Sequence, residues 1–426
     1  MTAIMLSTMV ILLLLGFPMM MPLIIATLAA FFLFFDMLNP TIIVQQMIGG
    51  VKPTALIAIP MFIFSADIIT RGRSADRLLD LVMRFVGHLR GGLAVTVAAT
   101  CTLFGAVSGS TQATVVAVGG PMRPRMLKAG YDDAFTMALA INASDIAFLI
   151  PPSIGMIVYG VLTGTSISEL FIAGIGPGLL ILVMFSAYAI YYAWRHRIPV
   201  EPKASWSERL QAIRRAIWPA GFPLIIVGGI YGGIFSPSEA ASVCVLYAVV
   251  LEVLIFRSVK VTELPRIALS TGLVTAVVFI LIGAGAAFSW ALSYAEVPQT
   301  IIAGLNLHEA SPTMVLICIA VAFFIGCMFV DPIVVMLILI PIFLPVIRSS
   351  GLDPVLVGTM ITLQVAIGSA TPPFGCDIFT AIAIFRRPYM DVIRGTPPFV
   401  FMLLTTSVLL GAFPQIALFL RDLLTH

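Results

Sequence analysis

Residues 124–152 read PRMLKAGYDDAFTMALAINASDIAFLIPP, and residues 345–373 read PVIRSSGLDPVLVGTMITLQVAIGSATPP. The two stretches share a polar turn with Gly and Asp, an apolar run, and a Pro-Pro pair at the end. Five residues recur after the same 221 positions: Pro124, Gly130, Asp132, Pro151 and Pro152 are matched by Pro345, Gly351, Asp353, Pro372 and Pro373. In a membrane protein, two copies of an interrupted apolar segment indicate a binding site at the interface between the copies.

Composition places the chain in a lipid bilayer. Of its 426 residues, 60% are hydrophobic and 10% are charged, and the mean hydropathy is +1.11, whereas soluble domains carry about 25% charged residues. The apolar runs 3–35, 168–194, 239–256 and 397–420 are each long enough to cross about 30 Å of hydrocarbon. The first run lacks a basic start and a small-residue cleavage site, so we interpret it as a retained helix. The predicted fold class is an all-α integral membrane protein.

Charge and residue usage exclude several functions. The net charge of +3 indicates no nucleic-acid partner. The five cysteines lie in apolar segments without metal-ligand spacing and the four histidines are scattered, so neither a transition-metal site nor a nucleophile–base pair is expected. No GxxxxGK[ST] phosphate-binding motif occurs, which favours an ion gradient as the energy source. Two alternatives to a carrier remain, a channel with a continuous polar pore and a membrane-embedded enzyme.

Lys and Arg, which mark cytoplasmic loops, give a consistent threading. Residues 71–90 and 121–133 are both basic, yet the apolar stretch between them is interrupted at Ser108-Gly109-Ser110-Thr111-Gln112. A re-entrant hairpin that turns at this polar tip keeps both ends in the cytoplasm. The run 313–349, broken near Gly326 to Pro332, begins and ends outside and therefore enters from the opposite face. Two repeats of opposite topology are typical of secondary transporters.

Three basic amphipathic stretches, 73–87, 206–215 and 258–267, are predicted to lie as helices at the cytoplasmic interface. Their role is either connection and anchoring or the bracing of a stationary scaffold while the hairpins move.

The two Pro-Pro pairs predict unwound backbone within the membrane. Proline removes an N–H donor and clashes with the preceding turn, and unwound backbone at membrane depth lines a cavity or is buried in protein. The carbonyls freed at 147–150 and 368–371 are candidate ligands for a hard cation such as Na⁺. The helix N-termini that follow the breaks favour an anion.

Polar side chains gather at the same places. Asn142, Ser144 and Asp145 precede the first break, and further acids, Asp331 and Asp377, accompany the second repeat. Acidic residues at membrane depth are functional candidates by default. For Asp331 two roles stay open, ion coordination and an N-cap before Pro332. The first tip carries Ser108, Ser110, Thr111, Gln112 and Thr114.

Six motifs carry a resemblance to a known family. They are LFGAVSGSTQATVVAVGGPMRPRMLKAGYDD (103–133), IPPSIGMIVYG (150–160), GIFSPSEAA (233–241), EVPQTI (296–301), DPIVVMLILIPIFLPV (331–346) and GSATPPFG (368–375). Together they resemble the large membrane subunit of tripartite ATP-independent periplasmic (TRAP) transporters over nearly the whole chain. The resemblance implies an elevator-type importer of organic anions in the bacterial inner membrane, usually coupled to Na⁺. It also implies two partners, a small four-helix membrane subunit and a soluble periplasmic binding protein. The substrates expected from it are sialic acids, C4-dicarboxylates, sugar acids and other carboxylates.

Carried over by motif, the resemblance assigns ions and substrate to the tips and breaks. The predicted ion-binding residues are Ser108, Gly109, Ser110, Asn142, Ser144, Gly326, Asp331, Gly368 and Thr371. The predicted substrate-binding residues are Thr111, Gln112, Pro151, Ser153, Ser369, Pro372 and Gly375. Relatives commonly have glycine or small residues where this chain has Asn142-Ala143-Ser144-Asp145, so two roles stay open for Asp145, contact with an ion and a structural role.

The repeats also suggest a division into moving and stationary parts. The transport domain is expected to comprise 91–165 (first hairpin and broken helix) and 311–390 (second hairpin and broken helix). Scaffold helices are expected at 1–90 and 166–310, with a C-terminal helix at 391–426.

Overall fold

The chain is a bundle of helices. The computed structural model describes residues 2–35, 38–304 and 310–425, and within these ranges it contains helices and turns but no strand. Six helical stretches are long and apolar enough to span a membrane: Thr54–Arg71, Ile167–Arg195, Pro237–Ile255, Val261–Tyr294, Pro312–Phe329 and Pro332–Ser349. Two bent pairs, Trp206–Ala216 with Gly221–Tyr231 and Pro397–Ala412 with Gln415–Leu424, raise the number to eight if each is one span. The predicted all-α membrane fold is therefore confirmed.

The first predicted hairpin is present. Helix α6 (Gly92–Ser108) ends at Gly109, whose φ of +61° reverses the chain. The return arm consists of α7 (Thr111–Thr114), the π-helical turn η2 (Val115–Gly119) and α8 (Gly120–Lys128), all of which pack against α6. Ser110 caps the return arm, since its Oγ accepts the Ala113 N–H at 3.4 Å. The polar tip predicted at 108–112 is thus a two-residue turn.

The first broken helix follows the hairpin. Helix α9 (Asp133–Ser144) begins at Asp132, whose carboxylate accepts the N–H groups of Ala134 and Phe135. It tightens into the 3₁₀ turn η3 (Asp145–Phe148), and the chain then passes through Pro151-Pro152 before α10 (Ile154–Thr163). Ser153 caps α10 by accepting the Met156 N–H at 3.3 Å.

The second repeat reproduces these elements. Its hairpin is α18 (Pro312–Phe329) and α19 (Pro332–Ser349), and its broken helix is α20 (Pro354–Ser369) and α21 (Cys376–Phe385). The caps Asp331 and Asp353 stand 221 positions after the caps Ser110 and Asp132. Both Pro-Pro peptide bonds are cis. The repeat seen in the sequence is therefore a repeat of structure.

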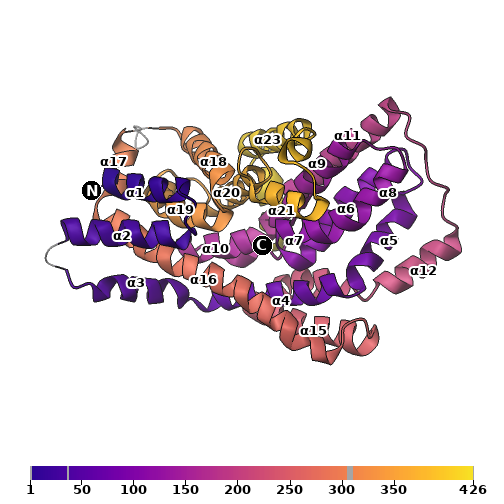
Figure 1. The fold of residues 1–426 in the computed structure, drawn as a ribbon, viewed down its shortest axis with the longest axis horizontal. Coiled ribbons are helices and arrows are strands. Elements are labelled where there is room, and N and C mark those ends of the chain that lie inside the picture. Colours follow the sequence, from indigo (N-terminus) through magenta and orange to yellow (C-terminus); the bar gives the residue numbers. More distant parts are fainter. Residues whose placement is uncertain (1, 36–37, 305–309, 426) are drawn as a thin grey trace.

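The two hairpins enter from opposite ends of the molecule. Helix α11 (Ile167–Arg195) has 29 residues and is about 43 Å long. Near its C-terminal end, Ala189 lies against Gly91 at the base of the first hairpin. Around its N-terminal end, Glu169 shares a pocket with Arg348 and Asp353 at the base of the second hairpin. Figure 1 shows the same arrangement, with α6 and α8 on one side, α18 and α19 on the other, and α7, α10 and α21 between them.

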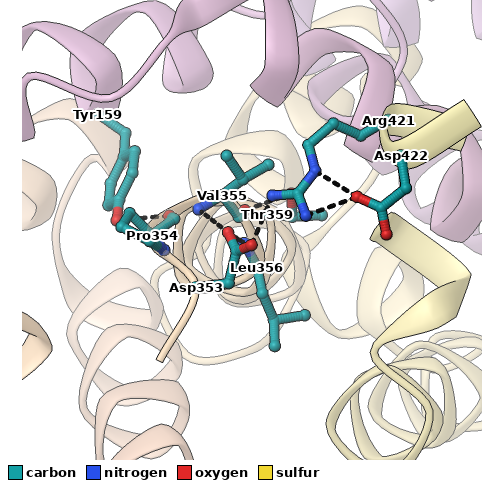
Figure 2. A network of polar contacts seen from close by, with 8 residues as sticks. All are labelled: Tyr159, Asp353, Pro354, Val355, Leu356, Thr359, Arg421 and Asp422. Carbon is teal, nitrogen blue, oxygen red and sulfur yellow. Dashed lines mark hydrogen bonds and ion pairs between the residues drawn. The ribbon is translucent and has the colours of Figure 1, made fainter. Parts of the chain in front are cut away.

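Ion pairs fasten the outer ends of both repeats. Figure 2 shows Arg421 of α24 (Gln415–Thr425) bound to Asp353 at 2.5 Å and to Asp422, beside Tyr159, whose hydroxyl donates to the Pro354 carbonyl. In the first repeat, Asp133 pairs with Arg123 at 2.7 Å and with Arg387 at 3.0 Å. The hydrogen bonds from Arg123 lower the pKa of the Asp133 carboxyl. The start of each broken helix is thus held by arginines from other elements.

The remaining helices surround the repeats. They are α1 (Thr2–Leu14), α2 (Met20–Phe34), α3 (Thr41–Val51), η1 (Thr54–Ile57), α4 (Ala58–Arg71), α5 (Ser74–Val86), α12 (Trp206–Ala216), α13 (Gly221–Pro223), η4 (Leu224–Gly228), α14 (Gly229–Tyr231), α15 (Pro237–Val249), η5 (Val250–Ile255), η6 (Val261–Glu263), α16 (Leu264–Tyr294), α17 (Val297–Gly304), α22 (Tyr389–Ile393) and α23 (Pro397–Ala412). The long α16 packs on α2, α3, α4 and α19, and α15 packs on α4.

Two sequence predictions about helices were wrong. The run 3–35 is two helices, α1 and α2, packed against each other, because Gly16 has a φ of +80° and Pro18 follows it. The stretch 258–267 is not a separate amphipathic helix, since η6 leads directly into the 31-residue α16. The amphipathic helices predicted at 73–87 and 206–215 are present as α5 and α12, which pack against each other.

A buried glutamate joins α5 to the scaffold. The Glu252 side chain is fully buried, and its carboxylate accepts the N–H groups of Arg73 and Ser74, both at 3.0 Å. It also accepts a hydrogen bond from the Ser258 hydroxyl. A Cβ at Gly72 would lie 2.1 Å from the Glu252 carboxyl carbon, so only glycine lets the chain pass this close. Glu252 therefore serves as the N-terminal cap of α5 from a distant helix.

We expect Glu252→Ala to destabilise the protein by on the order of 3 kcal/mol, because the N–H groups of Arg73 and the buried Ser74 lose their acceptor. The measurement is the thermal unfolding of the purified protein in detergent. Glu201→Ala, at an exposed glutamate, is the matched control and should change stability by less than about 0.5 kcal/mol. Equal melting of the two variants would contradict this role.

Candidate functional site

A cavity of about 410 Å³ lies where the two hairpin tips meet the scaffold. The first tip contributes Ser108, Ser110, Thr111 and Gln112, and the second contributes Asp331. The opposite wall is mostly apolar and comes from α4 and α16. The residues of this wall are Ile63, Ala66, Asp67, Val274, Val277, Val278 and Leu281. The cavity therefore lies between the predicted transport domain and the predicted scaffold.

The first tip rests directly on the first break. A Cβ at Gly109 would lie 2.2 Å from the Pro152 carbonyl oxygen, and a Cβ at Gly105 would lie 2.6 Å from the Ala147 Cα. Within the tip, the Thr114 hydroxyl donates to the Ser110 carbonyl at 2.8 Å and lies 3.2 Å from the Ser108 hydroxyl. Glycine is required here for close backbone contact as well as for its positive φ.

Asp377 connects the first tip to the second break. Its side chain is fully buried, and its two oxygens accept hydrogen bonds from Thr111 at 2.8 Å and from Ser369 at 2.7 Å. Thr111 belongs to the first repeat and Ser369 to the second, so one carboxylate holds the two repeats together. The sequence marked Asp377 as an intramembrane acid but gave it no partner.

The second break is packed against the second hairpin. The Phe374 N–H donates to the Met328 carbonyl at 3.0 Å. A Cβ at Gly368 would lie 2.5 Å from that of Cys327, and one at Gly375 would lie 2.3 Å from the Ser369 carbonyl oxygen. Gly326 makes its close contact within the hairpin, with Val335 of α19.

The Thr371 hydroxyl, predicted to bind an ion, forms a hydrogen bond within the protein. It donates to the Ile367 carbonyl at 2.6 Å, one turn back in α20. This bond is the usual one for threonine in a membrane helix. An ion could still reach the lone pairs of the Thr371 oxygen, so its ion-binding role stays a prediction.

Before the first break, several polar atoms are buried without a partner. Asn142 and Asp145 are fully buried; Asn142 Nδ2 donates to the Ala138 carbonyl, but Asn142 Oδ1 and both Asp145 oxygens accept no hydrogen bond among the described residues. Ser144, in contrast, donates to the Ile141 carbonyl at 2.5 Å. An unpaired buried carboxylate is costly. Asn142 and Asp145 therefore leave three buried oxygens without a hydrogen-bond donor among the described residues.

The structure divides the predicted site residues into two groups. Five of them line the cavity: Ser108, Ser110, Thr111, Gln112 and Asp331. The others build the breaks, the caps and the close contacts beside it: Gly109, Asn142, Ser144, Pro151, Ser153, Gly326, Gly368, Ser369, Thr371, Pro372 and Gly375. Of the two roles open for Asp331, the N-cap is present, since its Oδ1 accepts the Ile333 N–H at 2.9 Å. Sequence reasoning missed Asp67, an acid within the apolar helical stretch Thr54–Arg71 that could have been found by the same rule as Asp145.

Opposed hairpins, broken helices and a cavity between them define a class, a membrane carrier with an internal inverted repeat. The family model of the tripartite ATP-independent periplasmic transporter, DctM component, matches residues 6–416. The chain belongs to this family and is a TRAP transporter large permease subunit, a multi-pass protein of the inner membrane. It is a transporter component and not an enzyme.

Relatives with high sequence identity agree with this assignment. The ectoine/5-hydroxyectoine TRAP transporter large permease protein UehC of Ruegeria pomeroyi is 68% identical, over 98% of this chain and 97% of its own. The ectoine TRAP transporter large permease protein TeaC of Halomonas elongata is 66% identical, over 99% of each chain. The C4-dicarboxylate TRAP transporter large permease protein DctM of Pseudomonas aeruginosa is 36% identical over 86% of each.

The fold is also that of transporters with little sequence identity. The YdaH transporter of Alcanivorax borkumensis aligns with a TM-score of 0.64 at 17% identity, over 88% of this chain and 87% of its own. MtrF of Neisseria gonorrhoeae aligns with a TM-score of 0.56 at 12% identity, over 99% of this chain and 94% of its own.

Gly109→Ala should abolish transport and lower the melting temperature, because the added Cβ meets the Pro152 carbonyl. Gly164→Ala is the matched control, since Gly164 also has a positive φ, of +79°, but has no atom within 4 Å of the added Cβ. The control should lose only the stability that a left-handed backbone costs a residue with a Cβ, about 1–2 kcal/mol. Uptake in proteoliposomes and thermal unfolding measure the two effects. If Gly109→Ala and Gly164→Ala show the same uptake and the same melting temperature, the close contact of Gly109 with Pro152 is not required for transport.

Proposed function

We propose that this chain is the subunit that carries substrate and ions across the membrane in a three-part importer. The importer takes up ectoine and similar zwitterions and is driven by a Na⁺ gradient. The observation that supports the substrate class most directly is the charge of the cavity. Asp67 and Asp331 line it, and no Lys, Arg or His is among its described lining residues. The sequence-based expectation of an organic anion such as a sialic acid or a C4-dicarboxylate is therefore revised here to a zwitterion.

The electrostatic argument compares the two substrate classes. Succinate and related dianions would enter a low-dielectric cavity that already holds carboxylates, and like charges at such distances repel strongly. Ectoine has one carboxylate and one amidinium group, so its net charge is zero and its cation can face an acidic side chain. The two relatives that carry ectoine in their names, at 68% and 66% identity, support the same choice over the C4-dicarboxylate relative at 36%.

The Na⁺ proposal rests on the unpaired oxygens before the first break. The Asp145 carboxylate and Asn142 Oδ1 are oxygen ligands of the type that hard cations prefer, and the structure gives them no hydrogen-bond donor among the described residues. The carbonyls between Ala147 and Ile150 lie at the same break. Na⁺ is cargo here, and its binding would neutralise a carboxylate that is costly to bury.

Coupling would follow from the contacts of the tips. A cation near η3 would stabilise the break on which Gly109 rests, since η3 packs against α6 and α7. Both the ion and the substrate would then favour the closed arrangement of the hairpins, and this differential affinity is what shifts a population between states. We propose that 91–165 and 311–390 move as one body against the scaffold. The small four-helix membrane subunit would complete that scaffold, and the periplasmic binding protein would deliver the substrate.

Proteoliposomes that contain this chain, its small subunit and its binding protein should accumulate ectoine against a concentration gradient when Na⁺ is outside. Replacing external Na⁺ by choline should lower uptake at least ten-fold. Succinate and N-acetylneuraminate should not be taken up, with or without the binding protein. Passive flux that stops at equal concentrations would support a channel, and succinate uptake at the ectoine rate would reject the substrate class.

Asp145→Asn should raise the half-saturating Na⁺ concentration for uptake at least ten-fold while leaving the protein at least as stable in the absence of Na⁺. The neutral amide is less costly to bury than an unpaired carboxylate. Asp391→Asn, at an exposed aspartate, is the control and should alter neither quantity. A variant that melts earlier in choline but keeps the parental Na⁺ dependence would show that Asp145 is structural.

A further inference from the structure

Asp67 is an acidic side chain on the scaffold wall of the cavity. It lies in α4, within the span Thr54–Arg71, and is half-buried. The Thr271 hydroxyl of α16 donates to Asp67 Oδ2 at 2.6 Å. No other hydrogen bond to Asp67 occurs within the part of the chain that the structure describes, and no Lys, Arg or His lines the cavity beside it.

The hydrogen bond from Thr271 fixes how Asp67 presents its charge. One carboxylate oxygen is held by α16, and the other, Oδ1, remains available to a ligand in the cavity. The neighbouring wall residues of α16 are Val274, Val277 and Val278. An apolar wall of this kind excludes water and strengthens a charge-assisted hydrogen bond.

The tip opposite Asp67 offers donors rather than charges. Gln112 is exposed to the cavity and carries amide N–H groups. Ser110 uses its oxygen to accept the Ala113 N–H, which leaves its hydroxyl proton for a ligand. Donors on the hairpin and an acid on the scaffold therefore face the same 410 Å³ space. A small molecule with an anionic and a cationic end fits this division.

We infer that Asp67, positioned by Thr271, is the specificity-determining residue that binds the cationic end of the substrate. The inference rests on the proposed transport of a zwitterion and names the group that would select it. The ligand chemistry is a planar amidinium whose N–H groups donate to Asp67 Oδ1. Asp331 also has one oxygen engaged, as the cap of α19, but it lies on the second hairpin tip and not on the scaffold wall that carries Asp67.

The experiment measures ligand binding at the permease alone. The complex of this chain and its small subunit is purified in lipid nanodiscs with Na⁺ and without the binding protein, and the rise in melting temperature is followed as ligand is added. Two probes are used: ectoine itself and 2-methyl-1,4,5,6-tetrahydropyrimidine, which keeps the amidinium group and lacks the carboxylate.

Asp67→Asn is the principal variant, because the amide oxygen still accepts from Thr271 while the charge is removed. We expect its half-saturating ectoine concentration to rise at least ten-fold and stabilisation by the carboxylate-free amidine to disappear. Thr271→Val, which keeps the charge and removes the positioning bond, should bind ectoine less than about three-fold more weakly. Asp80→Asn, at an acid on α5 paired with Arg84, should bind both probes as the parent does.

The results separate the role of Asp67 from the proposed function. If Asp67→Asn binds both probes like the parent, the role of Asp67 is overturned while the proposed function stands. If the parent protein is not stabilised by ectoine, the proposed function fails together with this inference. Asp67→Ser, which can also accept from Thr271, provides the same readout if the asparagine variant does not fold.

Discussion

Backbone polar groups that leave a helix inside an apolar environment must find partners within the protein, and this constraint governs the whole architecture. The chain interrupts its helices at 149–153 and 370–375, and each interruption is covered by a hairpin tip. The close contacts of Gly109 with Pro152 and of Gly368 with Cys327 show how tightly the tips are fitted.

The hairpin tips that cover the breaks also line the cavity of about 410 Å³, whose opposite wall is mostly apolar. Its donors come from the first tip and its acids from the second tip and from α4. Ion pairs are kept at the ends of the repeats, around Asp133 and Asp353. The basic side chains of this protein thus stabilise the periphery, and the cavity has only acidic charge. That distribution is a physical reason to expect a ligand with a cationic group.

The sequence predicted the parts of the fold that depend on local rules. The Pro-Pro pairs fixed the breaks, the basic clusters fixed the hairpin ends, and the glycine and serine at 109–110 marked the turn. The sequence did not predict the turn at Gly16, because the run 3–35 is apolar on both sides of this glycine. The sequence predicted a site at the interface between the repeats, but the link from Thr111 to Ser369 through Asp377 could not be found, because Thr111 and Asp377 lie 266 positions apart. Asp67 could be recognised as an acid within an apolar segment, but only the packing of α4 against α16 places it opposite the tips.

The two hairpins are attached to the rest of the transport domain in different ways, and Asp377 takes part in only one of them. The first tip is held through the Thr111 hydroxyl, which donates to a carboxylate. The second hairpin is held through a backbone hydrogen bond, which the Phe374 N–H of the second break donates to the Met328 carbonyl of α18. A change of charge near Asp377 acts on the first attachment, whereas the second has no ionisable partner. The two repeats share their backbone elements, yet only the first of these two attachments uses a charged side chain, so a change of charge at Asp377 would loosen the first hairpin and leave the attachment of the second in place.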